Sequence, residues 1–377
     1  HHAIFSAAYP LSLLGYTKSN KMNPSRKRKL IVALVFVAAS LHHMIFHGGD
    51  TILQLQQPQL DSRNTTSIDN TISRLQYIRP PGHKEELLGM FEELSDPSSY
   101  RWQQLPKTPK DIAQKYGIPE TSRDLKCNAN GATTTVGWIP SESSYYNVSA
   151  APAPFTHSGR IPRLIFQSWK TNQLKEELCN HVLVWSKMNP EYDYFLFDDD
   201  AVDNFIRLEY GKETFSAFAC VKVGAAKCDV WRLLVIYLFG GLYFDFDNRL
   251  ATRLADWNWG DRDVVTGRSC NAPRKHPGGC AHQWGLVYAP KHPVLYASIR
   301  ETLSNLAERK ATHVYDISFW SYYNGWRQGP YNQSYMPGWG DRFGGRVLFQ
   351  DDEAKDLMVE GNTHWQKQKQ MWYPECM

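Results

Sequence analysis

The chain has 377 residues, of which 42% are hydrophobic and 13% aromatic, and it carries 42 Lys and Arg against 38 Asp and Glu. This composition fits one large globular domain or two ordinary ones and argues against a disordered chain. The basic residues of the first 49 positions, where no acidic residue occurs, are Lys18, Lys21, Arg26, Lys27, Arg28 and Lys29. Without them acidic residues outnumber basic ones, so the charge gives no argument for a nucleic-acid-binding surface.

The basic cluster runs directly into residues 30–46, which contain no charged residue. As a helix this stretch reaches about 25 Å, enough to span a thin membrane, and its basic side is expected to stay cytoplasmic. We therefore expect a transmembrane signal anchor of a single-pass type II protein. A cleaved signal peptide is the alternative, but no small-x-small cleavage site follows the stretch. The first methionine is Met22, and we expect translation to start there, within the leader and cytoplasmic tail at residues 1–29.

The cysteines and the N-x-Ser/Thr acceptors all follow the predicted anchor, as expected for a lumenal body. They are Cys127, Cys179, Cys220, Cys228, Cys270, Cys280 and Cys376, with Asn64, Asn147 and Asn332 as the acceptors. An odd number of cysteines leaves at least one thiol unpaired in a monomer. Cys270 and Cys280 bracket a loop rich in Pro and Gly, and we expect them to pair. Zinc binding by these two with His276 and His282 fits no common ligand spacing.

Beyond the anchor, the composition divides the chain in two. Residues 47–109 are rich in Gln, Ser, Thr, Asn and Pro, which is typical of a stem. Residues 110–377 form the predicted lumenal catalytic domain, where apolar runs alternate with segments of helical periodicity, the pattern of an α/β fold. Strands are predicted at 163–169, 192–197, 242–247, 263–266, 284–289 and 346–350, and helices at 172–188, 202–210, 224–239 and 293–308.

The segment from Ala226 to Asp247 holds the residues best suited to chemistry. Asp245 and Asp247 are separated by one residue at the end of an apolar strand, so in extended geometry both side chains share a face. Two carboxylates there provide oxygen ligands for Mn²⁺ or Mg²⁺ bridging a diphosphate. On the preceding helix Asp229 and Arg232 also share a face and offer a ribose acceptor and a phosphate-pairing guanidinium. An Asp-x-Asp alone is a weak signal, and its context makes it specific.

This context resembles the sugar-binding region containing the DXD motif in glycosyltransferase family 32, which includes the yeast initiating α-1,6-mannosyltransferase. The similarity extends to residues 161–171 and 189–200, so the motif core covers roughly residues 160–250. The resemblance implies a GT-A type nucleotide-sugar-binding sandwich with a divalent ion, usually Mn²⁺, at the DXD motif. It also implies a retaining transfer, in the Golgi, of a hexose from GDP-mannose or a UDP-sugar to a glycan on a glycoprotein or glycolipid.

Carried over by position, the resemblance makes Asp245 and Asp247 the metal and donor motif, with Asp247 as a direct ligand. It assigns Asp229 and Arg232 to the donor sugar and phosphates. Such a site stabilises the leaving diphosphate by metal and guanidinium and supports attack from the front face without a dedicated nucleophile.

Other positions keep two interpretations. Trp169 matches an aromatic residue that stacks on the donor base, with core packing as the alternative. His364 is either a metal or diphosphate contact or an ordinary surface histidine. The aromatic tract at residues 319–326 either lines an acceptor-sugar cleft or packs in the core, and its interleaved Ser, Asn and Gly favour the cleft. Cys228 stands where the family often has alanine.

Two other classes of protein compete with the transferase. An aspartate-nucleophile phosphatase also carries Asp-x-Asp after an apolar strand, but it has Thr or Val where this chain has Arg249. A noncatalytic, membrane-tethered carbohydrate-binding protein is the stronger alternative. It differs from the enzyme in tolerating the loss of Asp245 or Asp247 without losing its ligand.

Overall fold

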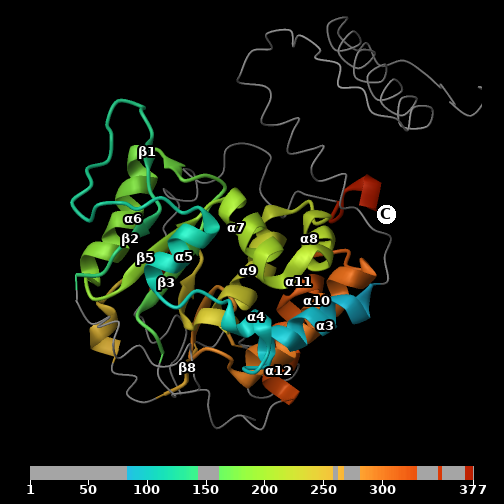
Figure 1. Cartoon of the computed structure of the whole chain (residues 1–377). Helices are drawn as coiled ribbons and strands as arrows, with labels where there is room; N and C mark the ends of the chain where they lie inside the picture. The colour runs from blue at the N-terminus through green and yellow to red at the C-terminus, as the bar shows by residue number, and fades with distance from the viewer. Residues whose placement is uncertain are drawn as a thin grey trace, which may run out of the picture. The chain divides into compact units, whose positions relative to one another are not determined.

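The computed structural model describes residues 83–142, 161–257, 262–266, 281–328, 347–349 and 370–376, all in the second of two units, Thr65–Met377 (Figure 1). Predictions that lie outside the described residues are the leader and anchor, the first part of the stem, the three glycosylation acceptors, the Cys270–Cys280 pair and His364. Within the described ranges, no helix has the length and apolar character that crossing a membrane requires.

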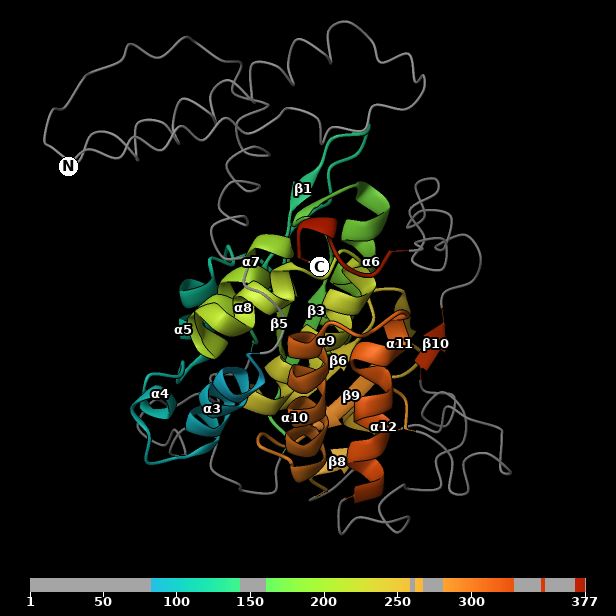
Figure 2. The same ribbon diagram turned by 90° about the vertical axis from the view of Figure 1, so that its right-hand side faces the viewer.

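A six-stranded mixed sheet lies at the centre of this unit, in the order β2–β5–β3–β6–β9–β8 (Figure 2). The three central strands β5, β3 and β6 are parallel, and the strands outside them pair antiparallel. The bounds are β2 Trp138–Ile139, β3 Leu164–Ser168, β5 Asp193–Phe197, β6 Gly241–Phe244, β8 Val264–Val265 and β9 Gly285–Tyr288. Because parallel strands require crossover connections, the chain places helices between them.

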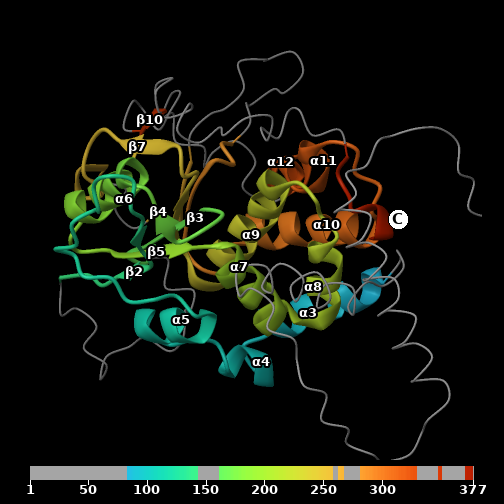
Figure 3. The ribbon, with the colours of Figure 1, turned by 90° about the horizontal axis from the view of Figure 1, so that it is seen from above.

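Helices cover both faces of the sheet (Figure 3). One face carries α6 (Glu176–Met188), and the other carries the longer set α7 (Asp199–Phe205), α8 (Gly211–Ala219), α9 (Gly224–Phe239) and α10 (Pro293–Glu308). The apolar core accordingly divides into two clusters. Alternate residues of β6 point to opposite faces, so Tyr243 belongs to the cluster under α9 while Leu242 and Phe244 belong to the cluster under α6.

The remaining elements are short or lie at the margins of the sheet. They are α3 Lys84–Ser95, α4 Tyr100–Gln103, α5 Pro109–Tyr116, β1 Thr134–Thr135, β4 Gln173–Leu174, the π-helix η2 Ile206–Tyr210, β7 Asn248–Leu250, η3 Leu254–Trp257, α11 Val314–Ile317, α12 Phe319–Gln328, β10 Val347–Phe349 and η6 Pro374–Cys376. β1 pairs with β4 and β7 with β10, both antiparallel.

The predicted α/β alternation is confirmed from residue 163 onward. The helices at 224–239 and 293–308 have the predicted bounds, and the strands at 163–169 and 192–197 are found one or two residues shorter. Gly240 ends α9 with φ of 66° and Gly241 follows with φ of 91°. A Cβ on Gly241 would lie 2.6 Å from the Leu164 carbonyl oxygen, so only glycine allows β6 to start so close to β3.

The predicted stem needs a correction at its end. Helices α3 and α4 pack on the sheet domain, and Leu87, Phe91, Leu94 and Trp102 are buried in the larger core cluster. The polar composition of this segment predicts a stem, but the amphipathic α3 packs on α10, about 200 residues further along the chain. This part of the segment 47–109 therefore belongs to the folded unit.

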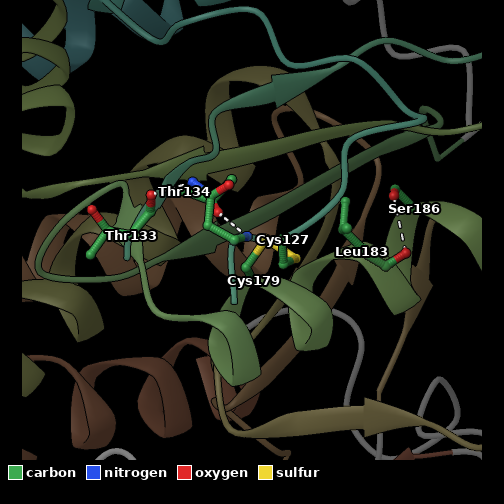
Figure 4. The surroundings of a disulfide bond; sticks show 7 residues. Cys127, Thr133, Thr134, Cys179, Leu183 and Ser186 are labelled. Atoms are coloured by element: carbon green, nitrogen blue, oxygen red, sulfur yellow. Dashed lines mark hydrogen bonds between the residues drawn. A yellow bond between two sulfur atoms is a disulfide. The ribbon is translucent and has the colours of Figure 1, made fainter. Parts of the chain in front are cut away.

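Two disulfides fix segments to the core. Cys127–Cys179 links the segment before β1 to α6, as Figure 4 shows. Cys220–Cys376 links the end of α8 to the C-terminal η6. Cys228 is the free cysteine among the described residues, which confirms that one thiol stays unpaired there. Neither pair was predicted, because sequence spacing does not give connectivity.

The aromatic tract at residues 319–326 forms helix α12, which packs along α10. Tyr322 and Trp326 are buried in the core, and Trp320 is exposed to 40%. In the sequence the interleaved Ser, Asn and Gly favour an acceptor-sugar cleft, but on a helix the small residues let α12 approach α10 closely. Gly325, for example, has no room for a Cβ next to Ser298. The structure therefore shows that the rings of Tyr322 and Trp326 pack in the core.

Candidate functional site

The DXD motif lies directly after the central strand β6. The strand ends at Phe244, so the prediction that residues 242–247 form one extended strand is wrong for its last three residues. Asp245 N still donates to the Trp284 carbonyl at 2.9 Å, and Asn248 N then donates to the Asp245 carbonyl at 3.0 Å. Asn248 Nδ2 also donates to Asp247 at 3.3 Å. The two carboxylates are thus presented by a hydrogen-bonded turn, for which Asp is a favoured first residue.

The central residue of the motif, Phe246, anchors this turn in the protein. It is 5% exposed and stacks on the Trp169 ring, with centroids 4.9 Å apart and planes at 20°. The His181 ring meets Phe246 edge-on at 5.4 Å. Trp169 itself is half-buried at the end of β3, so the structure brings it beside the DXD motif, as the prediction of a donor-stacking residue requires.

Arg232 carries a positive charge next to the acidic side chains of the site. Its Nη1 donates to Asp245 Oδ1 at 2.7 Å and to the Gln283 carbonyl at 3.1 Å, and its Nη2 contacts Asp229 one turn earlier on α9. Arg232 and Asp229 are buried, whereas the Asp245 side chain is 34% exposed. Burial alone would lower the pKa of Arg232, but the charge of Asp245 and neighbouring groups raises it above its usual value. Arg232 therefore remains a cation.

The sequence did not identify Tyr243 as part of this site. Its hydroxyl donates to Asp245 Oδ1 at 2.6 Å, and the guanidinium carbon of Arg232 lies 5.2 Å from its ring centroid. Burial, reinforced by the charge of Asp245, raises the pKa of Tyr243 well above its usual value, so the hydroxyl keeps its proton. Strand alternation was the available signal, because residues two apart share a face.

Gln283 is a second residue that sequence reasoning missed, and no local signal pointed to it. Its carbonyl accepts from Arg232, and its side-chain Nε2 donates to Ser318 Oγ at 3.1 Å. The residue lies just before β9, which pairs with β6 and so brings residues 283 and 284 alongside the DXD turn. Only strand pairing across the sheet creates this contact.

The carboxylate pair fits a hard divalent cation that shares its coordination with a substrate. Among the described residues, no three His, Cys, Asp or Glu side chains gather into a metal-ligating cluster. Mg²⁺ and similar ions are commonly held by one or two carboxylates together with waters and substrate phosphates. In addition, the buried Arg232 Nε has no hydrogen-bond partner in the described part of the chain, as expected where a separate anion completes the site.

The part of the chain that holds this site matches a known protein family. Residues 175–265, which contain Asp229, Arg232 and both motif carboxylates, match the family described as glycosyltransferase sugar-binding region containing DXD motif. The resemblance drawn from the sequence is thereby confirmed, and the match supports a transferase.

Several relatives are named as mannosyltransferases. The chain is 30% identical over 147 residues to inositol phosphoceramide mannosyltransferase 3 of Schizosaccharomyces pombe, covering 38% of this chain and 37% of that protein. It is 24% identical over 155 residues to the initiation-specific alpha-1,6-mannosyltransferase of the same organism, covering 37% and 39%. The matched part thus spans about two fifths of the length of these relatives. A solved structure, PaToxG glycosyltransferase, aligns with a TM-score of 0.32 and 16% identity over 45% of this chain and 69% of that chain.

Proposed function

We propose that the chain is a retaining glycosyltransferase of the GT-A type that moves mannose from GDP-mannose to a glycan acceptor. The observation that carries this proposal is the buried Arg232, held between Asp229 and Asp245 at the DXD turn, inside the region that matches the glycosyltransferase family. Mannose is favoured over the hexoses of UDP-sugars because the relatives are named as mannosyltransferases.

Each residue of the site has its own proposed role in activating the donor. Asp245 and Asp247 would hold a Mn²⁺ or Mg²⁺ ion, which when bound supplies positive charge to the donor diphosphate. Arg232 adds a fixed guanidinium for the charge that develops on the leaving diphosphate, and because it is already held in place, no reorganisation is needed. Asp229 orients Arg232 and offers its carboxylate to a donor hydroxyl. Trp169, stacked on Phe246, gives the donor base a flat surface.

The two relatives described above differ in the acceptor that their names indicate. One relative is named for inositol phosphoceramide, a ceramide lipid, and the other for initiating α-1,6-linked mannose. We propose a mannose-containing glycan as the acceptor and treat a ceramide lipid as the outcome to be excluded.

We also propose that the protein resides in the Golgi membrane with its catalytic domain in the lumen. The support is the apolar stretch at residues 30–46, preceded by basic residues, and the two disulfides of the folded unit. Disulfides form and persist in the oxidising secretory pathway and are rare in the cytosol.

A donor-hydrolysis panel on the purified full chain tests the proposal. GDP-mannose, UDP-galactose, UDP-glucose and UDP-N-acetylglucosamine are each incubated with and without Mn²⁺, and release of the nucleoside diphosphate is measured. We expect Mn²⁺-dependent release from GDP-mannose, and transfer when a mannose-containing glycan is added. Absence of metal-dependent turnover of any donor would contradict the proposal.

The variant Asp247→Asn gives the sharpest test of the site. It keeps the size of the side chain and removes the charge, so turnover should fall by about 100-fold or more while the melting temperature stays unchanged. Asp256→Asn, an exposed aspartate on η3, is the matched control and should retain wild-type turnover. Full donor binding with no turnover in the wild-type chain would instead favour the noncatalytic carbohydrate-binding alternative.

A further inference from the structure

A row of three side chains leads from the end of β3 to the DXD turn. Ser168 Oγ lies 3.0 Å from Cys228 Sγ, and Cys228 Sγ lies 3.0 Å from Tyr243 Oη. Tyr243 Oη in turn donates to Asp245 Oδ1 at 2.6 Å. The three groups come from β3, α9 and β6, so their meeting point is made by the tertiary structure. We call Ser168, Cys228 and Tyr243 the relay.

The direction of every hydrogen bond in the relay follows from counting hydrogens. The Asp245 carboxylate, paired with Arg232, can only accept, so the single hydroxyl hydrogen of Tyr243 goes to it. Toward Cys228, Tyr243 Oη is then an acceptor, and the thiol must supply its hydrogen. Because that hydrogen is used, Sγ accepts from the Ser168 hydroxyl. All three donors therefore point along the relay toward Asp245.

We propose that Ser168, Cys228 and Tyr243 are positioning residues that hold the Asp245 carboxylate in the orientation in which it would bind the divalent metal ion. Hydrogen bonds in such a row polarise one another, so a thiol donating to Tyr243 strengthens the bond from Tyr243 to Asp245. Tyr243 and Arg232 both engage Oδ1, which fixes the carboxylate from two sides. Asp245 nevertheless keeps a third of its side chain exposed, where a ligand can reach it.

This inference rests on the proposed function and adds to it a role for residues that touch neither metal nor donor. A serine at position 228 can both donate and accept, as the thiol does, whereas an alanine removes the central member of the relay. Replacing Ser168 by alanine removes only the outermost donor. The three substitutions Cys228→Ala, Cys228→Ser and Ser168→Ala therefore separate the hydrogen bonds of the relay from the packing of the site.

The experiment measures Mn²⁺ binding to the purified full chain by electron paramagnetic resonance of the free ion, with GDP present and, in a parallel arm, with UDP. We expect Cys228→Ala to weaken Mn²⁺ binding about 2- to 10-fold, the size expected for one hydrogen bond. Ser168→Ala should weaken it less, and Cys228→Ser should restore most of the loss. The Mn²⁺ concentration for half-maximal turnover should rise in the same order, while kcat at saturating Mn²⁺ stays within about twofold. Ser304→Ala, on α10 away from the relay, is the control.

Wild-type Mn²⁺ affinity in both Cys228→Ala and Ser168→Ala would overturn the relay, and so would a Cys228→Ser variant as impaired as Cys228→Ala. If Cys228→Ala fails to fold, Ser168→Ala and Cys228→Ser carry the test by themselves. Failure of the proposed function looks different. In that case the wild-type chain turns over no nucleotide sugar, whereas the Mn²⁺ affinities of the variants still report on the relay.

Discussion

Arg232, which is buried, and Lys291, which is half-buried, are two basic side chains with different surroundings. Arg232 is surrounded by carboxylates, and its neighbours raise its pKa. Lys291, between β9 and α10, has no carboxylate within ion-pairing distance among the described residues. Its Nζ donates to the Leu94 carbonyl at 2.6 Å and lies 4.2 and 4.4 Å from the ring centroids of Trp102 and Tyr237. Burial lowers the pKa of Lys291 well below its usual value.

Lys291 and Arg232 differ in how fully the protein satisfies their hydrogen-bond donors. Lys291 satisfies a carbonyl at the C-terminal end of α3, where helix geometry leaves acceptors without partners, and so it fastens α3 to the sheet domain. Arg232 keeps a buried N–H without a described partner and lies beside a partly exposed carboxylate. We therefore propose a ligand-binding role for Arg232 and a structural role for Lys291.

The largest effect is expected at Arg232. In Arg232→Lys the charge remains, but one ammonium cannot contact Asp229, Asp245 and the Gln283 carbonyl as the two guanidinium nitrogens do. We expect kcat/KM for donor turnover to fall by about 100-fold or more, measured with Mn²⁺ saturating. Arg249→Lys, an exposed arginine on β7, is the matched control. Equal activity in both variants would remove Arg232 from the site.

A smaller effect, on stability alone, is expected at Lys291. In Lys291→Met the Leu94 carbonyl loses its partner, which should lower the free energy of unfolding by about 1 kcal/mol at pH 7, as followed by urea denaturation. Donor turnover should remain within about twofold of wild type, because the side chain is remote from the DXD turn. A loss of turnover without a loss of stability would erase the distinction between the two cations.

The smallest expected effect is the contribution of Lys291 to the pH dependence of the unfolding free energy. Its pKa is lowered in the folded protein and normal in the unfolded chain, so between the two values the unfolded chain binds more protons. Folding stability relative to Lys291→Met should therefore rise as the pH increases toward about 10 and fall as the pH decreases.

The control for this pH dependence is Lys110→Met, since Lys110 is exposed on α5. Its unfolding free energy should follow that of the wild-type chain at every pH. A wild-type protein that loses stability relative to Lys291→Met between pH 7 and 10 would contradict the assignment.

The amino-acid sequence by itself determined the helices and strands that carry the site and the identity of its main charges. The helix from Gly224 to Phe239, its Gly-Gly end and the DXD motif are local patterns, because periodicity and backbone freedom act within a few residues. Asp229, Arg232 and Asp245 were named from sequence and contact one another in the structure, and Trp169 stacks on Phe246 of the same DXD motif.

Only the tertiary structure decided which groups complete them. The contacts of Arg232 with Gln283 and of Tyr243 with Cys228, the packing of α3 on α10, and the pairing of Cys220 with Cys376 join residues between 15 and 208 positions apart. Such contacts depend on the order of strands in the sheet and on which helix faces meet. A single sequence holds no local signal for either, because the free energy that selects them comes from burial shared by distant segments.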